Sequence, residues 1–242
     1  MINVRDEIEE IVLSFQSNGD IVSFTDNLDG TYTINTSDLG NLQSGFKIVL
    51  TYADSSLNRD VVISSITSSS FTFSGTNITE PTGWQMAVYF EVGHRIELNK
   101  KYENKAKAIN KRVQEYPLFW LYTDFERTPS DLEHVAFDTV LQGAIVDFSD
   151  KDYYEEQRID ENFKPVLYPY LELFNAALNT LPYKGKFNTP YGSGKEIDII
   201  TTDRPFFGSA DQTANVLPQV TDAVEWQVNL AWNKNDEVCT SY

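Results

Sequence analysis

In the stretch AIVDFSDKDYYEEQR, residues 144–158, an apolar run typical of a strand ends and a helical pattern begins. Five of these fifteen residues are acidic. Such a cluster can be a metal site, a group of catalytic carboxylates, or the junction between a strand and a helix. The spacing of the carboxylates and the sequence on both sides distinguish these three explanations.

The spacing in this stretch does not fit a known carboxylate site. An EF-hand loop that began at Asp147 would need glycine at its sixth position, where Asp152 stands. Glycoside hydrolysis needs two carboxyl groups that are set apart in space, which adjacency in sequence does not supply. We therefore interpret the stretch as a junction in which Asp150 or Asp152 caps a helix. Glu155 and Glu156 then lie in the first turn, where the helix dipole favours negative charge.

The sequence before this junction predicts strands. Residues 118–123 (LFWLYT) and 135–149 (VAFDTVLQGAIVDFS) are rich in β-branched and aromatic residues. Gly143 interrupts the second run, so we expect a bend or bulge there. A further strand is predicted over 223–232 (AVEWQVNLAW), which alternates apolar and polar residues cleanly.

Helical periodicity marks three segments. The first is the N-terminal run from Val4 to Phe15, and the second covers residues 102–116. The third and strongest is the apolar stripe of residues 153–181. It contains Pro165 and Pro169, which cannot donate backbone hydrogen bonds, so we expect it to be kinked or split.

Residues 20–93 differ from the rest of the chain. Short β-rich runs alternate with turn residues, including the hairpin signal Asp29-Gly30, and residues 18–93 hold only two basic residues, Lys47 and Arg59. We therefore predict an inserted β-sandwich or β-barrel domain over residues 20–93. Residues 1–19 and 94–242 are predicted to form an α+β domain, with helices packed on a mainly antiparallel sheet.

Composition restricts the function. The 242 residues carry 19 Lys and Arg against 36 Asp and Glu, a net charge of -17, which opposes general attraction to nucleic acid or anionic lipid. No stretch approaches the roughly 20 apolar residues of a membrane span, so we expect no membrane association. The single cysteine, Cys239, excludes an intrachain disulfide framework and fits a reducing compartment.

No motif for catalysis or cofactor binding is present. The loop TPYGSGKE, residues 189–196, lacks the first glycine and the final Ser or Thr of a phosphate-binding loop. His94 and His134 have no second ligand at metal-binding spacing, and no nucleophile-elbow pattern occurs. We predict a protein that is not an enzyme and has no cofactor or metal.

Two segments are candidates for subunit contacts. Seven of the 19 basic residues lie between Arg95 and Arg112. That segment can be a solvated helix face, a salt-bridge surface between subunits, or a DNA contact. The adjacent Phe206 and Phe207 lie in a predicted long loop, residues 201–222, where they can fold onto the core or anchor a neighbouring subunit. The interface candidates are Lys105, Lys111, Arg112, Asp150, Asp152, Glu155, Glu156, Phe206 and Phe207.

Residues 117–181 resemble tailed-bacteriophage neck proteins of the tail-terminator and head-tail connector family. The likeness consists of a short strand (PLFWLYTDFER), a long strand ending in IVDFS, an acidic-aromatic junction and a long amphipathic helix. The resemblance implies a virion structural protein, a homo-oligomeric ring around a channel that DNA crosses without sequence-specific binding. It also implies portal, adaptor or tail proteins as neighbours, and assembly in the host cytoplasm.

Two other classes of function stay open. A carbohydrate- or protein-binding accessory module of a virion would use aromatic residues of the β insert, which can equally form its core. A hydrolase with scattered carboxylates is the third class. The aromatic residues in question are Tyr32, Tyr52, Phe71, Phe73 and Trp84.

Overall fold

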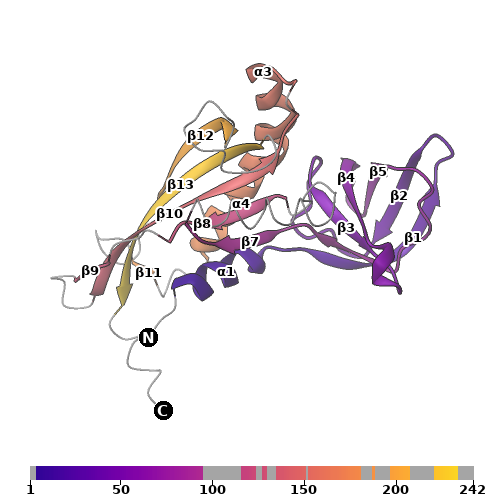
Figure 1. The fold of residues 1–242 in the computed structure, drawn as a ribbon. Helices are drawn as coiled ribbons and strands as arrows, with labels where there is room; N and C mark the ends of the chain where they lie inside the picture. Colours follow the sequence, from indigo (N-terminus) through magenta and orange to yellow (C-terminus); the bar gives the residue numbers. More distant parts are fainter. Residues whose placement is uncertain are drawn as a thin grey trace, which may run out of the picture.

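The computed structural model describes residues 4–94, 116–123, 127–129, 135–150, 152–180, 187–188, 197–207 and 221–233. Two β structures dominate it: a closed barrel and a seven-stranded sheet. In Figure 1 the barrel lies to the right and the sheet to the left, with the helical segments near the sheet.

The barrel has six strands in the order β1-β2-β5-β4-β3-β6, and β6 closes it by pairing with β1. All of its pairs are antiparallel, and the Asp29-Gly30 turn joins β1 to β2 as the hairpin signal predicts. A single turn of 3-10 helix, η1, lies between β3 and β4. The bounds are β1 (Asn18–Asp26), β2 (Thr31–Thr36), β3 (Lys47–Thr51), η1 (Ser55–Leu57), β4 (Arg59–Ile66), β5 (Ser70–Ser74) and β6 (Gly83–Met86).

The sheet has the order β11-β13-β10-β8-β7. In addition, β12 pairs with β13, and β9 pairs with β10. Its pairs are antiparallel except β7 with β8. The centre is the pair β10–β13, strands of 14 and 13 residues. The bounds are β7 (Tyr89–Val92), β8 (Leu118–Leu121), β9 (Arg127–Pro129), β10 (Val135–Phe148), β11 (Phe187–Asn188), β12 (Ile199–Phe207) and β13 (Thr221–Asn233).

One long helical segment follows β10. It consists of α3 (Glu155–Arg158), the π-helical η2 (Ile159–Leu167) and α4 (Tyr168–Leu178), which run on without a break. Pro165 lies inside η2 and Pro169 is the second residue of α4, and the helical segment runs through both although neither can donate a backbone hydrogen bond. The two prolines therefore do not split the helix, contrary to one of the two expected outcomes. The predicted N-terminal helix is confirmed as α1 (Val4–Ser14).

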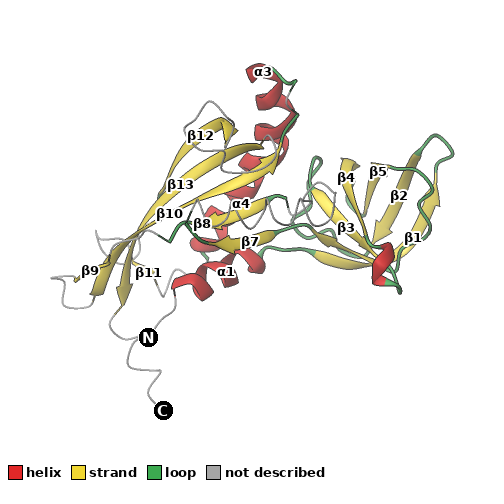
Figure 2. Cartoon of the chain, in the orientation of Figure 1, coloured by secondary structure: helices red, strands yellow, loops and turns green. Residues whose placement is uncertain are grey.

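The predicted fold class, an α+β layer of helices on a sheet, is wrong. The chain is mostly β, and the part that the structure describes contains only one long helical segment (Figure 2). Strands β10 and β13 are more than twice the usual strand length of about five or six residues, and a closed barrel adds six more strands. The helix predicted over residues 102–116 lies, apart from Tyr116, outside the described residues. The periodic patterns located α1 and the alternating part of β13, but they placed a loop over residues that belong to β12 and gave no measure of how far strand pairing dominates.

The barrel and the long helical segment share one continuous hydrophobic core. Phe46, just before β3, stacks on Tyr170 of α4 with ring centroids 4.4 Å apart. The Tyr170 hydroxyl donates a hydrogen bond of 2.9 Å to the Ala87 carbonyl, in the link from β6 to β7. That residues 20–93 form a separate inserted domain stays a prediction. Deleting these residues would remove the contacts of Phe46 and Ala87 with Tyr170.

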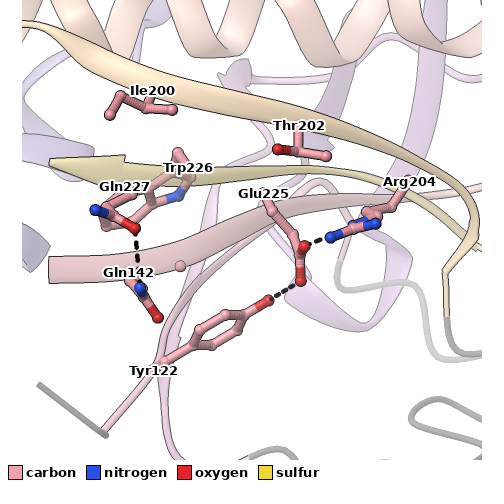
Figure 3. Close-up of a pocket in the computed structure, with 9 residues that line it drawn as sticks. Tyr122, Gln142, Ile200, Thr202, Arg204, Glu225, Trp226 and Gln227 are labelled. Atoms are coloured by element: carbon pink, nitrogen blue, oxygen red, sulfur yellow. Dashed lines mark hydrogen bonds and ion pairs between the residues drawn. The ribbon is translucent and has the colours of Figure 1, made fainter.

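The two faces of the sheet have different surroundings. Val224, Trp226 and Val228 are buried on the helix side, where Trp226 lies 5.0 Å from Phe174 between ring centroids. The predicted alternation of β13 is thus confirmed for these residues. Glu225 and Gln227 point to the opposite face, which is partly open to solvent (Figure 3).

Gly143 of β10 allows the β8 backbone and the Trp226 ring to lie close to its Cα atom, and it makes no bulge. Its pairing with Trp226 on β13 and Leu121 on β8 continues without a register shift. A Cβ at this position would come within 2.4 Å of the Trp120 carbonyl and of the Trp226 ring. The indole of Trp226 therefore occupies the space that any larger residue would need.

Replacing Gly143 with Ala should destabilise the fold by about 1–3 kcal/mol, because overpacking forces the Trp226 ring or the β8 backbone to move. Urea denaturation followed by tryptophan fluorescence measures the loss. Gly93→Ala is the matched control, since a Cβ at Gly93 meets nothing within 4 Å, and it should change stability little. Equal stability of the two variants would contradict the close-approach explanation.

Candidate functional site

The junction after β10 is built around a fully buried arginine. The Nη1 atom of Arg158 donates to Asp222 Oδ1 at 2.9 Å and to Ser149 Oγ at 2.7 Å. Its Nη2 atom donates to the Asp150 carbonyl at 2.7 Å, and its Nε atom to the Tyr153 carbonyl at 3.1 Å. Every nitrogen of the guanidinium group is thus hydrogen-bonded, which a buried charge requires.

Asp222 is satisfied on both oxygens. Its second oxygen, Oδ2, accepts from Asn162 Nδ2 at 3.0 Å, and the same amide lies 3.4 Å from the Phe148 carbonyl. Both side chains of the ion pair have no exposed surface. The network therefore fastens the end of β10, the start of the long helical segment and the first residues of β13 to one another.

The predicted capping role of Asp150 and Asp152 is wrong. The N-cap of α3 is Tyr154, whose N–H donates to the Gln157 side chain at 3.0 Å. Asp150 instead accepts from the Asp152 N–H at 3.0 Å, which closes a local turn before the helix. The α3 helix begins at Glu155, three residues after Asp152, and Arg158 folds back from it to bind the Asp150 and Tyr153 carbonyls.

The acidic interface candidates lie on the surface of this junction. Glu155 and Glu156 are in the first turn of α3, as predicted, and are exposed, as are Asp150 and Asp152. Figure 1 shows α3 at the upper end of the molecule, beyond the sheet. These four carboxylates thus form one exposed acidic surface around a buried cation.

The remaining interface candidates are placed only in part. Phe206 and Phe207 are the last two residues of β12, so the strand runs on past Pro205, where a long loop was predicted. The pairing of β12 with β13 shifts register between Arg204 and Phe207. The three basic candidates, Lys105, Lys111 and Arg112, lie outside the described residues, as do His134 and residues 189–196.

The open face of the sheet carries a polar groove of about 220 Å³ (Figure 3). In it Glu225 accepts from the Tyr122 hydroxyl at 3.1 Å and forms an ion pair of 2.7 Å with Arg204. Beside it the Gln142 amide donates to Gln227 at 3.0 Å. The Glu225 carboxylate is thus held by two donors, which suits a contact surface better than proton transfer. These residues come from strands far apart in sequence. The only sequence signal for the groove is therefore the row of polar residues that alternates along β13.

The aromatic residues considered for carbohydrate binding form the barrel core. Tyr32, Phe71, Phe73 and Trp84 are buried, and Tyr52 is partly buried. Ring contacts connect them, for example Phe71 with Trp84 at 5.7 Å between centroids. A carbohydrate-binding module would need exposed aromatic side chains, and these residues do not supply them.

Three further observations bear on function. Within the described ranges, no group of three or more His, Cys, Asp or Glu side chains is arranged to hold a metal ion. In those same ranges, no helix has the length and apolarity that crossing a membrane requires. No protein-family model, curated protein or solved structure matches the chain.

Asp147 lies opposite Asp222 in the β10–β13 ladder. Burial raises the pKa of this half-buried carboxyl to about 6, and the charge of Asp222 adds to the rise. The charge of Lys47, from the barrel, and the Phe148 N–H act in the opposite direction. A titratable carboxyl thus lies where the sheet meets the barrel.

Removing one partner of the buried ion pair should be costly. Asp222→Ala leaves the Arg158 charge unpaired in the core and should lower the free energy of unfolding by about 3–5 kcal/mol. The double variant Arg158→Met/Asp222→Leu should be clearly more stable than Asp222→Ala, because no buried charge remains. Urea denaturation of both variants measures the difference.

The control for this prediction is Lys164→Met, which breaks the exposed Lys164–Asp160 pair of 2.7 Å. An exposed pair contributes about 1 kcal/mol or less, so this variant should resemble wild type. If Asp222→Ala lost no more stability than Lys164→Met, the network would not hold the junction.

The stability of the protein should depend on the ionisation of Asp147. Between about pH 4 and pH 6 the folded protein keeps a proton that the unfolded chain, with a pKa near 3.8, has released. The free energy of unfolding therefore falls as pH rises through this window. Asp147→Asn should remove this fall and be more stable than wild type at pH 7, by up to about 3 kcal/mol.

Urea denaturation from pH 4 to pH 8 tests this dependence. The exposed Asp152→Asn is the control and should keep the wild-type profile. A profile of Asp147→Asn that superimposes on wild type would show that Asp147 does not titrate in this window.

Proposed function

We propose that the chain is a structural subunit of a tailed-phage virion, forming a homo-oligomeric ring in the head-tail connector or at the tail end. The ring surrounds the DNA channel and joins neighbouring rings of portal, adaptor or tail proteins. The subunit works by binding its neighbours and has no catalytic role. The likeness of residues 117–181 to neck proteins motivates this proposal.

The observation that carries the proposal is the edge strand β12. This strand has nine residues and pairs along one side with β13, and no other described strand pairs with it. Unpaired backbone N–H and C=O groups on a sheet edge bind further strands, so proteins usually block them with charge, proline or bulges. Here Asp203, Arg204, Pro205 and the register shift affect only the second half.

The first half of β12 has the sequence IITT and carries no such block. Ile200 presents 61% of its surface to solvent, beside the polar groove. An unblocked edge with an exposed apolar side chain fits a contact with another subunit. Phe206 and Phe207 end the same strand, so the aromatic interface candidates belong to this contact in the proposal.

The net negative charge of the chain supports the proposed location beside DNA. It also means that assembly needs a contact that offsets repulsion between subunits. A subunit of net charge -17 suits a channel along which DNA slides, because Lys and Arg contacts would retard it. Identical acidic subunits repel each other, and a local basic surface offsets this repulsion. In the proposal, Lys105, Lys111 and Arg112 meet the exposed carboxylates around α3 of a neighbouring subunit.

Ile200→Lys should weaken self-association by about tenfold or more, because it places a charge at an apolar contact. Folding should be unaffected, since Ile200 is exposed within the subunit. Mass photometry over a concentration series measures the oligomer, and negative-stain microscopy shows whether it is a ring. Leu57→Lys, a barrel residue with 50% exposure, is the control. A wild-type protein that stays monomeric and is absent from virions would refute the proposed function.

A further inference from the structure

The tip of the β1–β2 hairpin holds an apolar side chain in an unusual position. Leu28 exposes 91% of its surface, the largest fraction of any large hydrophobic residue described. Its φ angle of 62° is in the left-handed region, which leucine rarely adopts. A leucine there is unfavourable both for the backbone and for contact with water.

The turn around Leu28 is held by several side chains. Asp26 Oδ1 accepts from the Leu28 N–H at 2.9 Å. Asp29 Oδ1 accepts from the Thr31 N–H at 2.9 Å and from the Thr31 hydroxyl at 2.6 Å. The Asn27 amide also donates to Thr31 Oγ1 at 2.9 Å. These bonds hold Leu28 outward in one conformation, so little conformational freedom is lost when it binds a partner.

The outer wall of the same barrel contains a groove with two valines in its lining. The groove has a volume of about 550 Å³, within the range of roughly 300–1,000 Å³ that is usual for ligand pockets. Val61 and Val62 line it, and Val62 is 53% exposed. Its other lining residues are Lys47, Asp60, Ser64 and Ser74.

The tip is acidic, and the groove holds one lysine and one aspartate. Leu28 lies between Asp26 and Asp29, and hydrogen bonds from Thr31 hold the pKa of Asp29 below its usual value. Lys47 in the groove is one of only two basic residues among residues 18–93. Asp60 also lines the groove; burial raises the pKa of its carboxyl, and the charge of Lys47 acts in the opposite direction.

We propose that Leu28 of one subunit inserts into the Val61–Val62 groove of a second copy of this chain, with its flanking aspartates beside Lys47. Tip and groove are different surfaces, so the contact is head-to-tail, and a repeated head-to-tail contact closes into a ring when its rotation allows. This inference rests on the proposed ring function and assigns a barrel-to-barrel contact to it.

Disulfide trapping tests the contact directly. In a Cys239→Ser background, a full-length chain with Leu28→Cys is mixed with a differently tagged chain with Val62→Cys and oxidised gently. We expect a cross-linked heterodimer on non-reducing gels. Val22→Cys replaces Leu28→Cys in the control mixture, because Val22 is on β1 and is 69% exposed. Equal cross-linking in both mixtures, or none in either, would overturn the proposal.

A second variant separates docking from folding. Leu28→Asn removes the apolar group but keeps a residue that tolerates positive φ, so its Tm should equal or exceed that of wild type. Self-association should nevertheless weaken at least fivefold by mass photometry. Val22→Thr is the control and should assemble like wild type. Unchanged assembly of Leu28→Asn would overturn the inference.

The outcomes distinguish this inference from the proposed function. Rings that form without Leu28–Val62 cross-links leave the ring function standing and overturn this inference. Absence of any oligomer, in solution and in virions, removes both. Cross-linking specific to Leu28, together with weaker assembly of Leu28→Asn, supports both.

Discussion

The ion pair between Arg158 and Asp222 is the interaction on which the arrangement of the sheet and the long helical segment depends. A guanidinium without solvent contact is tolerated only when every donor finds an acceptor. Here those acceptors come from the end of β10, from the turn before α3 and from the start of β13. Moving any of these three elements would leave a charge or a carbonyl unpaired, so the network determines where the helix can begin.

The position of the helix in turn determines how the barrel is attached. Because the segment runs unbroken from Arg158 to α4, its start sets the position of Tyr170, which stacks on Phe46 and bonds the Ala87 carbonyl. On its other side, Phe174 packs against Trp226, whose ring requires glycine at position 143. The barrel, the helix and the sheet therefore form one packed unit in which the charge of Lys47 on the barrel acts on Asp147 of the sheet.

Sequence patterns were informative wherever the structure repeats locally. The alternation around Trp226 and the periodicity of α1 predicted strands and helices, and Asp29-Gly30 predicted a hairpin. What these patterns could not show was pairing between distant segments. Asp222 ends the predicted loop of residues 201–222, and nothing in the sequence pairs it with Arg158, 64 positions earlier. The strand through Phe207 and the dominance of β structure are consequences of such long-range contacts, whereas the cap at Tyr154 depends on local bonds that its residue type does not reveal.

The net negative charge, the exposed edge of β12 and the Leu28 tip can be explained together by the requirements of subunit association. Strong net negative charge keeps separate subunits apart, so association needs contacts that are specific enough to overcome repulsion. An unblocked strand edge provides directional backbone hydrogen bonds but little selectivity, because any extended chain can satisfy it. In the proposed contact, the leucine between two aspartates provides the selectivity, since it needs a groove that offers both apolar side chains and a cation. Edge and tip lie on different parts of the molecule, the sheet and the barrel, so in the proposed ring the two weak contacts made together would hold a neighbour far more tightly than either alone.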